Sequence, residues 1–217
     1  MNKFLFLILL ILLSLSLNAQ SFYGGLTIGT TFSQVDGDDH GGFHKISPLG
    51  GVYVRNTYNS NWGSSLGIEY KQKGSKAVKK NSYGYIINYY AIRLDYVELP
   101  FLINYKLEKI KIPKLIDYDF KTDFWIDFGF SAAYLIKGTD DFGHGPVLPT
   151  GSREFKKYEI ANHLGLNYYL NDHWILYARF SYTFPLLPIR KHPGGQVYWI
   201  NRGQYNHNLS FAIKYEF

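Results

Sequence analysis

The sequence predicts an all-β fold, an eight-stranded antiparallel transmembrane β-barrel arranged as an up-and-down meander. Three observations lead to this prediction. The chain begins with a segment typical of an export signal, and eight later segments alternate apolar and polar residues with a period of two. The connections between those segments are alternately short and long, as expected for a barrel with short periplasmic turns and longer external loops.

The first segment, residues 1–19, has the features of a signal peptide. Lys3 supplies a basic start, residues 4–13 form an apolar run, and Ala19 ends a typical cleavage site. We expect cleavage after Ala19 and a mature barrel domain covering residues 20–217. The alternative is an uncleaved anchor helix, for which the apolar run is short. The absence of cysteine excludes a lipoprotein anchor and disulfide bonds.

The composition favours a membrane surface as the environment of the chain. It contains 20 Tyr, 16 Phe and 4 Trp, and aromatic rings with one polar end suit a boundary between lipid and water. The formal net charge is +6, but the basic residues are scattered along the chain. We therefore expect no nucleic-acid partner.

Each of the eight alternating segments has one apolar, aromatic face and one small, polar or charged face. The C-terminal segment is the clearest, because its odd positions from Tyr205 to Phe217 are Tyr, His, Leu, Phe, Ile, Tyr and Phe. In chain order, the segments cover residues 22–32, 51–58, 62–71, 94–107, 124–135, 158–170, 174–184 and 205–217. The apolar faces of the first three begin at Phe22, Val52 and Trp62; those of the fifth, sixth and seventh begin at Phe124, Tyr158 and Trp174.

Two architectures could use such strands. In a soluble sandwich the apolar faces would form a core, whereas in a membrane barrel they meet lipid and the polar faces fill a narrow lumen. The export signal, the even strand count and the connections favour the barrel. Tight turns are expected at 59–61 and 171–173, and long polar loops at 33–47, 73–90, 138–154 and 185–203.

The fourth segment, LDYVELPFLINYKL, contains a proline that a central strand should exclude. Its apolar residues are at even positions up to Tyr96 and at odd positions from Val97 onward. We interpret this phase change as a β-bulge, which would point Glu98 and Pro100 into the lumen and loosen the ladder around the proline.

Several motifs occur in an order that resembles the PorT-like outer-membrane β-barrel family of Bacteroidetes. They are G-x-x-x-G (25–29), I-E-Y-x-Q-K-G (68–74), Y-x-E-L-P (96–100), an aromatic-Gly pair (128–129), A-R-x-S-Y (178–182) and the terminal aromatic strand. The resemblance spans essentially the whole mature chain. It implies the barrel fold and an outer-membrane location. Some members of that family serve protein secretion and gliding, and most have no assigned role.

Charged residues on the predicted lumen face form the largest candidate site. We expect most of them to pair with one another, because an eight-stranded barrel leaves an interior only just wide enough for side chains. The alternative is a selectivity path for a small solute. The predicted lumen charges are Arg55, Glu69, Lys71, Glu98, Asp127, Glu159, Arg179 and Lys214, with Lys106 and Glu216 on the same face.

The other candidate sites are weaker. The first loop, from Asp36 to His44, carries carboxylates and imidazoles, but their spacing matches neither an EF-hand nor a zinc signature. We predict no metal site and no cofactor, and we interpret His144 and His192 as loop residues.

An enzyme of the lipid-hydrolase type would need a nucleophile and a histidine on one face of the barrel. His163 and Ser181 both face inward on neighbouring strands, and Asp127 could orient the histidine. By parity, His207 faces lipid whereas Ser210 faces the lumen. Neither a Gly-x-Ser-x-Gly nor a His-Glu-x-x-His motif is present. We predict that the protein is not an enzyme.

The sequence thus predicts a filled outer-membrane barrel that acts through its external loops as an adhesin, a receptor or an accessory of an envelope or secretion machine. A narrow solute channel and, less favoured, a lipid hydrolase are the alternatives. Outer-membrane lipid is one expected partner. A protein partner is expected at the loops or at a basic hairpin, residues 108–121, that would extend the fourth and fifth strands past the periplasmic rim. The alternative for this hairpin is a taller barrel wall that binds no partner.

Overall fold

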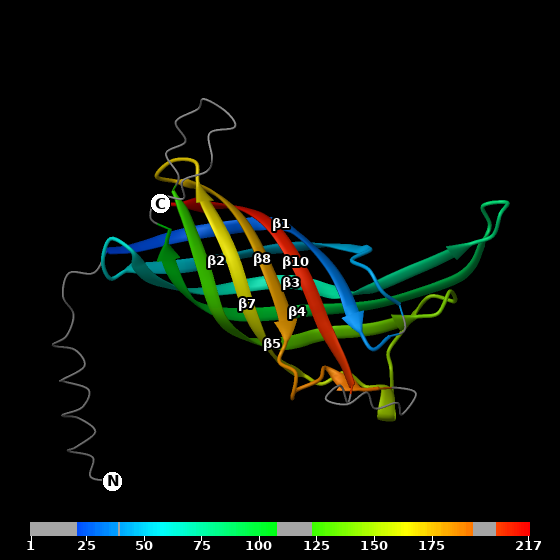
Figure 1. Ribbon diagram of the computed structural model, residues 1–217. Coiled ribbons are helices and arrows are strands. Elements are labelled where there is room, and N and C mark those ends of the chain that lie inside the picture. The colour runs from blue at the N-terminus through cyan, green and yellow to red at the C-terminus, as the bar shows by residue number, and fades with distance from the viewer. Residues whose placement is uncertain (1–20, 39, 108–122, 193–202) are drawn as a thin grey trace, which may run out of the picture.

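The computed structural model describes residues 21–38, 40–107, 123–192 and 203–217, which form one antiparallel sheet closed on itself (Figure 1). Eight long strands follow one another around the ring in chain order, and β1 pairs with β10 to close it. They are β1 (Ser21–Asp36), β2 (Lys45–Thr57), β3 (Trp62–Lys80), β4 (Ile86–Lys106), β5 (Phe124–Asp141), β7 (Tyr158–Tyr169), β8 (Trp174–Thr183) and β10 (Gly203–Glu216). The predicted eight-stranded meander barrel is confirmed.

Three short elements occupy the connections: β6 (Pro146–Val147), the 3-10 turn η1 (Gly151–Arg153) and β9 (Arg190–Lys191). None of the helical turns among the described residues is long and apolar enough to cross a membrane. The predicted signal peptide and the predicted hairpin 108–121 lie outside the described residues, and both stay predictions.

The tight turns at one end of the barrel form where the sequence predicts them, for a local reason. In the β2–β3 turn, the Asn59 side-chain oxygen accepts hydrogen bonds from the backbone N–H groups of Asn61 and Trp62, at 2.9 and 2.8 Å. Asn171 does the same in the β7–β8 turn. An asparagine that bonds the backbone two residues ahead closes a chain reversal without help from distant residues.

The outer face of the wall is apolar between two aromatic rows. At the external end, a row of directly paired outward residues runs Tyr70, Val97, Tyr134, Tyr158 across β3, β4, β5 and β7. At the end with the tight turns, Trp62 packs on Tyr105 at 4.6 Å between ring centroids. The apolar band on β3 therefore covers residues 62–70, close to the ~9–11 residues that a spanning strand needs. Two aromatic girdles around an apolar band are typical of outer-membrane barrels.

Beyond the external girdle, two strands continue where the sequence predicts a loop. The predicted loop 73–90 is wrong: β3 extends to Lys80, β4 begins at Ile86, and the two form a long hairpin that runs past the neighbouring strands (Figure 1). The predicted loop 33–47 is shorter than expected, at 37–44, whereas the predicted loop 138–154 is displaced to 142–157. The alternation is weak in these segments because no face of a projecting hairpin meets lipid.

The predicted phase change in β4 is also wrong. The even positions from Tyr90 to Asn104 are all buried, so one face of β4 points inward throughout. The irregularity lies in the neighbouring strand, where Asp95 pairs with Lys137 and Tyr96 with Leu135, leaving Ile136 as an extra residue. The apolar Leu94 and Tyr96 point into the barrel because its external end is filled by a hydrophobic cluster rather than by polar groups.

Candidate functional site: the filled lumen and the external hairpin

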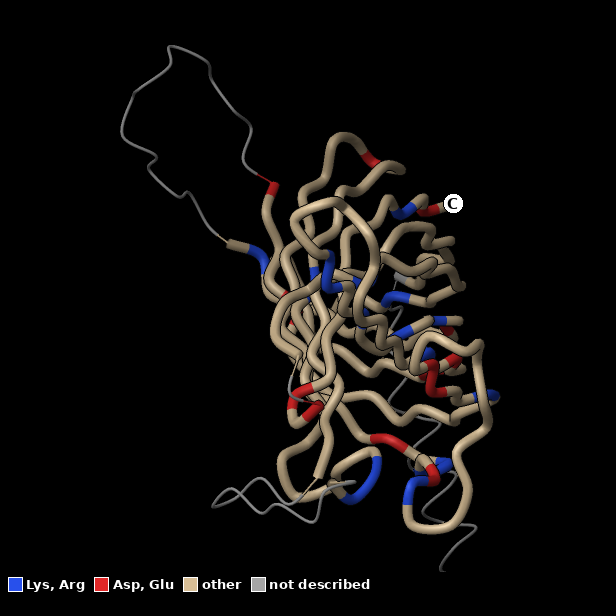
Figure 2. Tube along the Cα trace, turned by 90° about the vertical axis from the view of Figure 1, so that its right-hand side faces the viewer, with Lys and Arg blue, Asp and Glu red and all other residues tan. Residues whose placement is uncertain are grey.

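All eight predicted lumen charges point into the barrel, since each occupies an inward position of its strand. Their side chains are almost completely buried, and the most exposed, Arg55, retains 11% of its surface. Positive and negative residues are spread through the barrel rather than collected on separate sides (Figure 2). We call these eight residues, together with Lys73 and Glu216, the lumen network.

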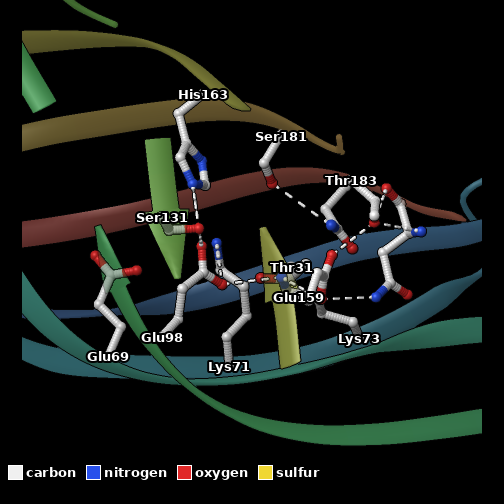
Figure 3. A network of polar contacts seen from close by, with 12 residues as sticks. Thr31, Glu69, Lys71, Lys73, Glu98, Ser131, Glu159, His163, Ser181 and Thr183 are labelled. Carbon is white, nitrogen blue, oxygen red and sulfur yellow. Dashed lines mark hydrogen bonds and ion pairs between the residues drawn. The ribbon is translucent and has the colours of Figure 1, made fainter. Parts of the chain in front are cut away.

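Glu98 lies at the centre of the lumen network (Figure 3). Its carboxylate is 3.0 Å from Lys73 Nζ and 3.8 Å from Lys71 Nζ, and it accepts a hydrogen bond from Ser131 Oγ at 2.8 Å. His163 Nε2 lies 3.2 Å from the same carboxylate. Two cations and two polar groups around one buried carboxylate offset the large cost of removing that charge from water.

A second buried carboxylate, Glu159, links the centre to the external part of the lumen. Lys73 Nζ lies 3.2 Å from Glu159 and so bridges the two carboxylates. Thr183 Oγ1 and Asn206 Nδ2 donate to Glu159 at 2.6 and 3.0 Å. Side chains from β3, β8 and β10 therefore meet at one carboxylate of β7, which joins opposite sides of the interior.

The other charges of the network pair toward the end with the tight turns. Arg179 forms an ion pair with Glu69 and lies over the ring of Tyr177. Lys214 Nζ donates to Asn167 at 2.9 Å. It also lies 3.9 Å from the Asp127 carboxylate.

Arg55 closes this end of the lumen with a two-pronged ion pair to Glu216, at 2.8 and 2.7 Å. The lumen network thus contains five cations and five carboxylates, each within 4 Å of an opposite charge. An evenly matched set of charges holds the wall together without leaving an excess of either sign.

Sequence reasoning missed Lys73 of the lumen network and a separate buried ion pair between Arg190 and Asp140, all three in segments interpreted as loops. Lys73 continues the inward period of Glu69 and Lys71, so following the alternation two residues further identifies it. Arg190 pairs with Asp140 at 2.7 Å, both side chains being fully buried, and no periodic pattern surrounds either residue. Only the folded chain brings these two residues together, one near the end of β5 and the other in β9.

The external end of the lumen is closed by a hydrophobic cluster. Its residues are buried at the external end of the interior, and Tyr96 of this cluster lies beside Lys73 of the lumen network. Its members come from β1, β4, β5 and the connections on either side of them: Val35, Tyr90, Ile92, Leu94, Tyr96, Ala133, Leu135, Phe155 and Ile189. Arg190 stacks on Phe155, with its guanidinium carbon 4.1 Å from the ring centroid.

One cavity lined by residues of the lumen network is small. It has a volume of about 10 Å³ and is lined by residues that include Tyr53, Asp127, Tyr169 and Lys214. That is room for about one water molecule. In the described structure, side chains fill the lumen.

The predicted hydrolase constellation does not assemble. His163 Nε2 contacts Ser131 Oγ at 2.7 Å, whereas its register partner Ser181 interacts with Asn208. Asp127 accepts a hydrogen bond from Asn104 and does not orient the histidine. Because Ser131 and Glu98 approach the same ring nitrogen and the His163 side chain is fully buried, this group lacks the nucleophile–base–orienter order and access to substrate.

The first loop folds onto the barrel wall instead of presenting a cluster of ligands. Burial raises the pKa of the Asp38 carboxyl, and the ring of Phe43 packs on His207 at 4.8 Å. His207 lies on the outer face, as its parity predicts, and Ser210 lies inside. In the part of the chain that the structure describes, no group of three His, Asp or Glu side chains could hold a metal ion. His144 is exposed in its loop.

Among the described residues, the tip of the β3–β4 hairpin exposes several large apolar side chains beyond the lipid band. Tyr83 and Tyr85 retain 84% and 73% of their surface, and Ile86 and Ile87 are more than half exposed. The turn that carries them is closed by Asn81, whose side-chain oxygen accepts from the backbone N–H groups of Tyr83 and Tyr85. Large apolar side chains held on an ordered turn in water are typical of a recognition surface.

Comparison with known proteins agrees with this architecture. A family model described as outer membrane protein beta-barrel domain matches residues 18–187. No curated protein matches the chain. Ail, the attachment invasion locus protein of Yersinia pestis, solved in complex with the heparin analogue sucrose octasulfate, is similar at 13% identity and a TM-score of 0.46, over 91% of this chain and 99% of that one.

Two other solved structures are similar at the same level. Neisserial surface protein A shares 12% identity and a TM-score of 0.45, over 92% of this chain and 100% of that one. OprG of Pseudomonas aeruginosa shares 12% sequence identity and a TM-score of 0.35, over 90% of this chain and 94% of that one. These likenesses are too distant to carry function. The family model, however, matches far more than half of the 217 residues, so the chain belongs to the outer membrane protein beta-barrel domain family and is a protein of the bacterial outer membrane.

Proposed function

We propose that this protein is a recognition protein of the outer membrane, an adhesin or receptor, which binds its partner through the tip of the β3–β4 hairpin. The observation that carries the proposal is the contrast between a filled, charge-matched lumen and an exposed aromatic tip on a rigid scaffold. Loops and hairpins held by a rigid framework commonly carry binding functions.

The chemistry of the tip favours a protein or glycan partner over a small solute. Tyr83 and Tyr85 offer large contact areas with few rotatable bonds, and tyrosine is enriched at the energetic centres of interfaces. Lys79 and Lys80, exposed beside them, add positive charge that would complement an acidic partner. The lumen lacks a comparable feature, since its buried charges already face one another.

The order of the sequence motifs supports membership of the PorT-like barrels. On that basis, the recognition function could take the form of an accessory role in an envelope or secretion machine. An enzymatic role finds no support in the buried His163–Ser131–Glu98 group. We therefore propose a protein without catalytic activity, with the lumen network acting as a structural seal.

Removal of the tip tests the binding proposal. Val78 pairs with Tyr89 in the hairpin, so residues 78–89 can be replaced by Asn-Gly, a preferred two-residue turn, between Ala77 and Tyr90. Cells that display the wild-type protein should adhere to immobilised glycans or host-surface proteins, and cells that display the shortened variant should not. Replacement of the periplasmic residue Asp172 by Asn is the matched control. Equal adhesion of both variants would refute the role of the tip.

Conductance tests the seal. In planar bilayers the purified protein should show no steady openings, because side chains fill the lumen. Steady nanosiemens openings in the wild-type protein would instead establish the narrow-channel alternative.

A further inference from the structure

The outward face of β3, β4 and β5 changes from apolar to basic just above the external girdle. Tyr70, Val97 and Tyr134 form the last lipid-facing row, and the next paired row outward is Gln72, Asp95 and Lys137. Aromatic girdles mark the level where hydrocarbon gives way to lipid headgroups. Side chains one to three rows further out therefore lie at the height of the headgroups.

Three exposed cations form a diagonal line across this face. Lys137 on β5 pairs with Asp95 on β4, and Arg93 lies two residues away along β4. Ala91 lies two residues beyond Arg93 and pairs with Lys76 on β3. Diagonal neighbours on one face of a sheet lie roughly 7–8 Å apart, so long side chains from adjacent positions can meet at one group. All three are exposed, and the Arg93 side chain retains 59% of its surface.

A fourth cation supports this line from the edge of β2. Lys45 Nζ donates to Gln72 Oε1 at 3.0 Å and to Ser47 Oγ at 2.9 Å. Burial lowers the pKa of Lys45 to about 8, and the positive charges of Arg93 and Lys76 contribute to this shift. Lys45 is thus close enough to Arg93 and Lys76 for their charges to repel it.

The carboxylates on this face offset only part of the positive charge. Asp95 accepts from Tyr70 Oη at 2.9 Å and from Gln72 Nε2 at 2.7 Å, and it forms an ion pair with Arg93 Nε at 3.3 Å. Asp141, in the row of Lys76, accepts from the backbone N–H groups of Gly143 and Gly145. An excess of positive charge therefore remains at the level of the headgroups.

We propose that Lys76, Arg93 and Lys137, supported by Lys45, form a binding site for the phosphate groups of a phosphorylated lipid of the outer leaflet. The acyl chains of that lipid would lie on the apolar band below the Tyr70–Tyr134 row, and its phosphates would meet the cations directly above. Arginine and lysine together suit a phosphate, since the guanidinium offers paired donors and the ammonium a compact charge. This site is separate from the hairpin tip.

Binding of diphosphorylated lipid A to the folded protein in detergent, measured by native mass spectrometry, tests the proposal. The triple variant Lys76→Gln, Arg93→Gln, Lys137→Gln should bind about 100-fold more weakly, because each of the three cations near an anionic lipid accounts for about a fivefold difference. The matched control, Lys79→Gln, Lys80→Gln, Lys191→Gln, removes the same charge elsewhere on the external side and should bind within about twofold of wild type. Removal of the lipid A phosphates should weaken binding to the wild-type protein as much as the triple variant does.

Several results would refute the proposed lipid-phosphate site. An equal loss in both triple variants would show general electrostatic attraction, and undiminished binding in the first would show that these cations are not used. Displacement of lipid A by inorganic phosphate at equal concentration would identify a free-ion site instead. If the triple variant does not fold, Arg93→Gln alone is measured against Lys79→Gln and should lose about fivefold. The variant that lacks residues 78–89 keeps all four cations and should bind lipid A normally, which separates this proposal from the adhesin proposal.

Discussion

At the residue scale, the fourth strand keeps its proline because the ladder to β3 is interrupted there. Leu66 pairs with Phe101 and Glu69 with Glu98, but no bridge joins the two positions between these pairs, where Pro100 stands opposite Gly67. A Cβ on Gly67 would lie 3.3 Å from the proline ring, so glycine gives the ring room. The missing N–H of proline thus falls where the strands do not exchange a hydrogen bond. Glu98 and Pro100 do point inward, as predicted, although the predicted bulge in β4 is not the cause.

Glu98 makes the clearest residue-scale prediction for stability. Glu98→Gln leaves Lys71 and Lys73 without their shared carboxylate in a closed interior, and breaking a buried ion pair in this way costs about 3–5 kcal/mol. Urea unfolding of the protein in lipid vesicles, followed by tryptophan fluorescence, measures the loss. The exposed Glu154→Gln is the control and should change stability by less than about 0.5 kcal/mol. A loss no larger than that of the control would show that water reaches Glu98.

The double variant Glu98→Gln with Lys71→Met refines this prediction. Removing one cation together with the carboxylate should recover part of the lost stability, because the unpaired buried charge is then eliminated. A double variant less stable than Glu98→Gln alone would show that Lys71 has another partner of equal weight.

Lys45 makes a prediction about pH. Its pKa of about 8 lies below the usual 10.5, so the folded state disfavours the protonated amine. The associated destabilisation is therefore present in full below pH 8 and is relieved as the pH rises from about 8 to 10.5. Amine labelling of Lys45 across pH should show a midpoint near 8. Arg93→Gln should raise this midpoint and Asp95→Asn should lower it; a midpoint near 10 in the wild-type protein would contradict the burial of Lys45.

At the element scale, the side chains of each strand face the lipid and the lumen alternately. A shift of one residue in the pairing of a strand would therefore exchange its two faces. Phe180 and Leu209 form a directly paired, outward couple on β8 and β10, while the adjacent Ser181 and Ser210 are fully buried. This alternation explains why hydrophobic residues cover the outside of the molecule and charges fill its inside.

Arginine substitutions test the outward rows. Phe180→Arg and Leu209→Arg should each cost about 2–4 kcal/mol if they lie near the bilayer midplane, since the charge is then placed in hydrocarbon. Folding into liposomes, followed by the heat-dependent shift in gel mobility, gives the difference from wild type. Tyr83→Arg, at the hairpin tip in water, is the control and should fold normally. Equal tolerance at all three positions would be incompatible with a lipid-facing band.

At the scale of the whole molecule, the barrel and the projecting hairpin are energetically separable. The ring is closed by β1 and β10, and every ion pair of the lumen network joins residues outside the segment 78–89. Gly74, at a backbone φ of +132°, marks the point where β3 leaves the barrel. A side chain there would collide with the carbonyl oxygen of Ile92, so this backbone conformation of residue 74 depends on glycine.

Replacement of residues 78–89 by Asn-Gly should therefore leave the barrel intact. We expect its free energy of unfolding in lipid vesicles to stay within about 1 kcal/mol of wild type, because the segment contributes no lipid-facing or lumen contact. Gly74→Val, by contrast, should lower stability measurably, since a branched side chain cannot adopt this backbone conformation. A shortened variant that fails to fold would show that the hairpin is part of the folding unit.

The sequence by itself determined the barrel, the number of strands, the tight turns and the inward direction of the eight predicted charges. These features depend on local rules: a period of two fixes which side chains share a face, and asparagine and glycine close turns without distant partners. Lys73 followed from the same rule and was missed only because the segment after Lys71 was interpreted as a loop.

Only the tertiary structure decided how far β3 and β4 extend beyond the lipid band, and which charged side chains form ion pairs with one another. The hairpin beyond residue 71 is stabilised by its partner strand, and the bulge at Ile136 arises from the register between β4 and β5. The pairing of Arg190 with Asp140, and of His163 with Ser131 instead of Ser181, depends on side chains reaching across a closed ring. Such contacts join residues far apart in the chain, and their distances are set by the closure of the barrel, which local alternation does not encode.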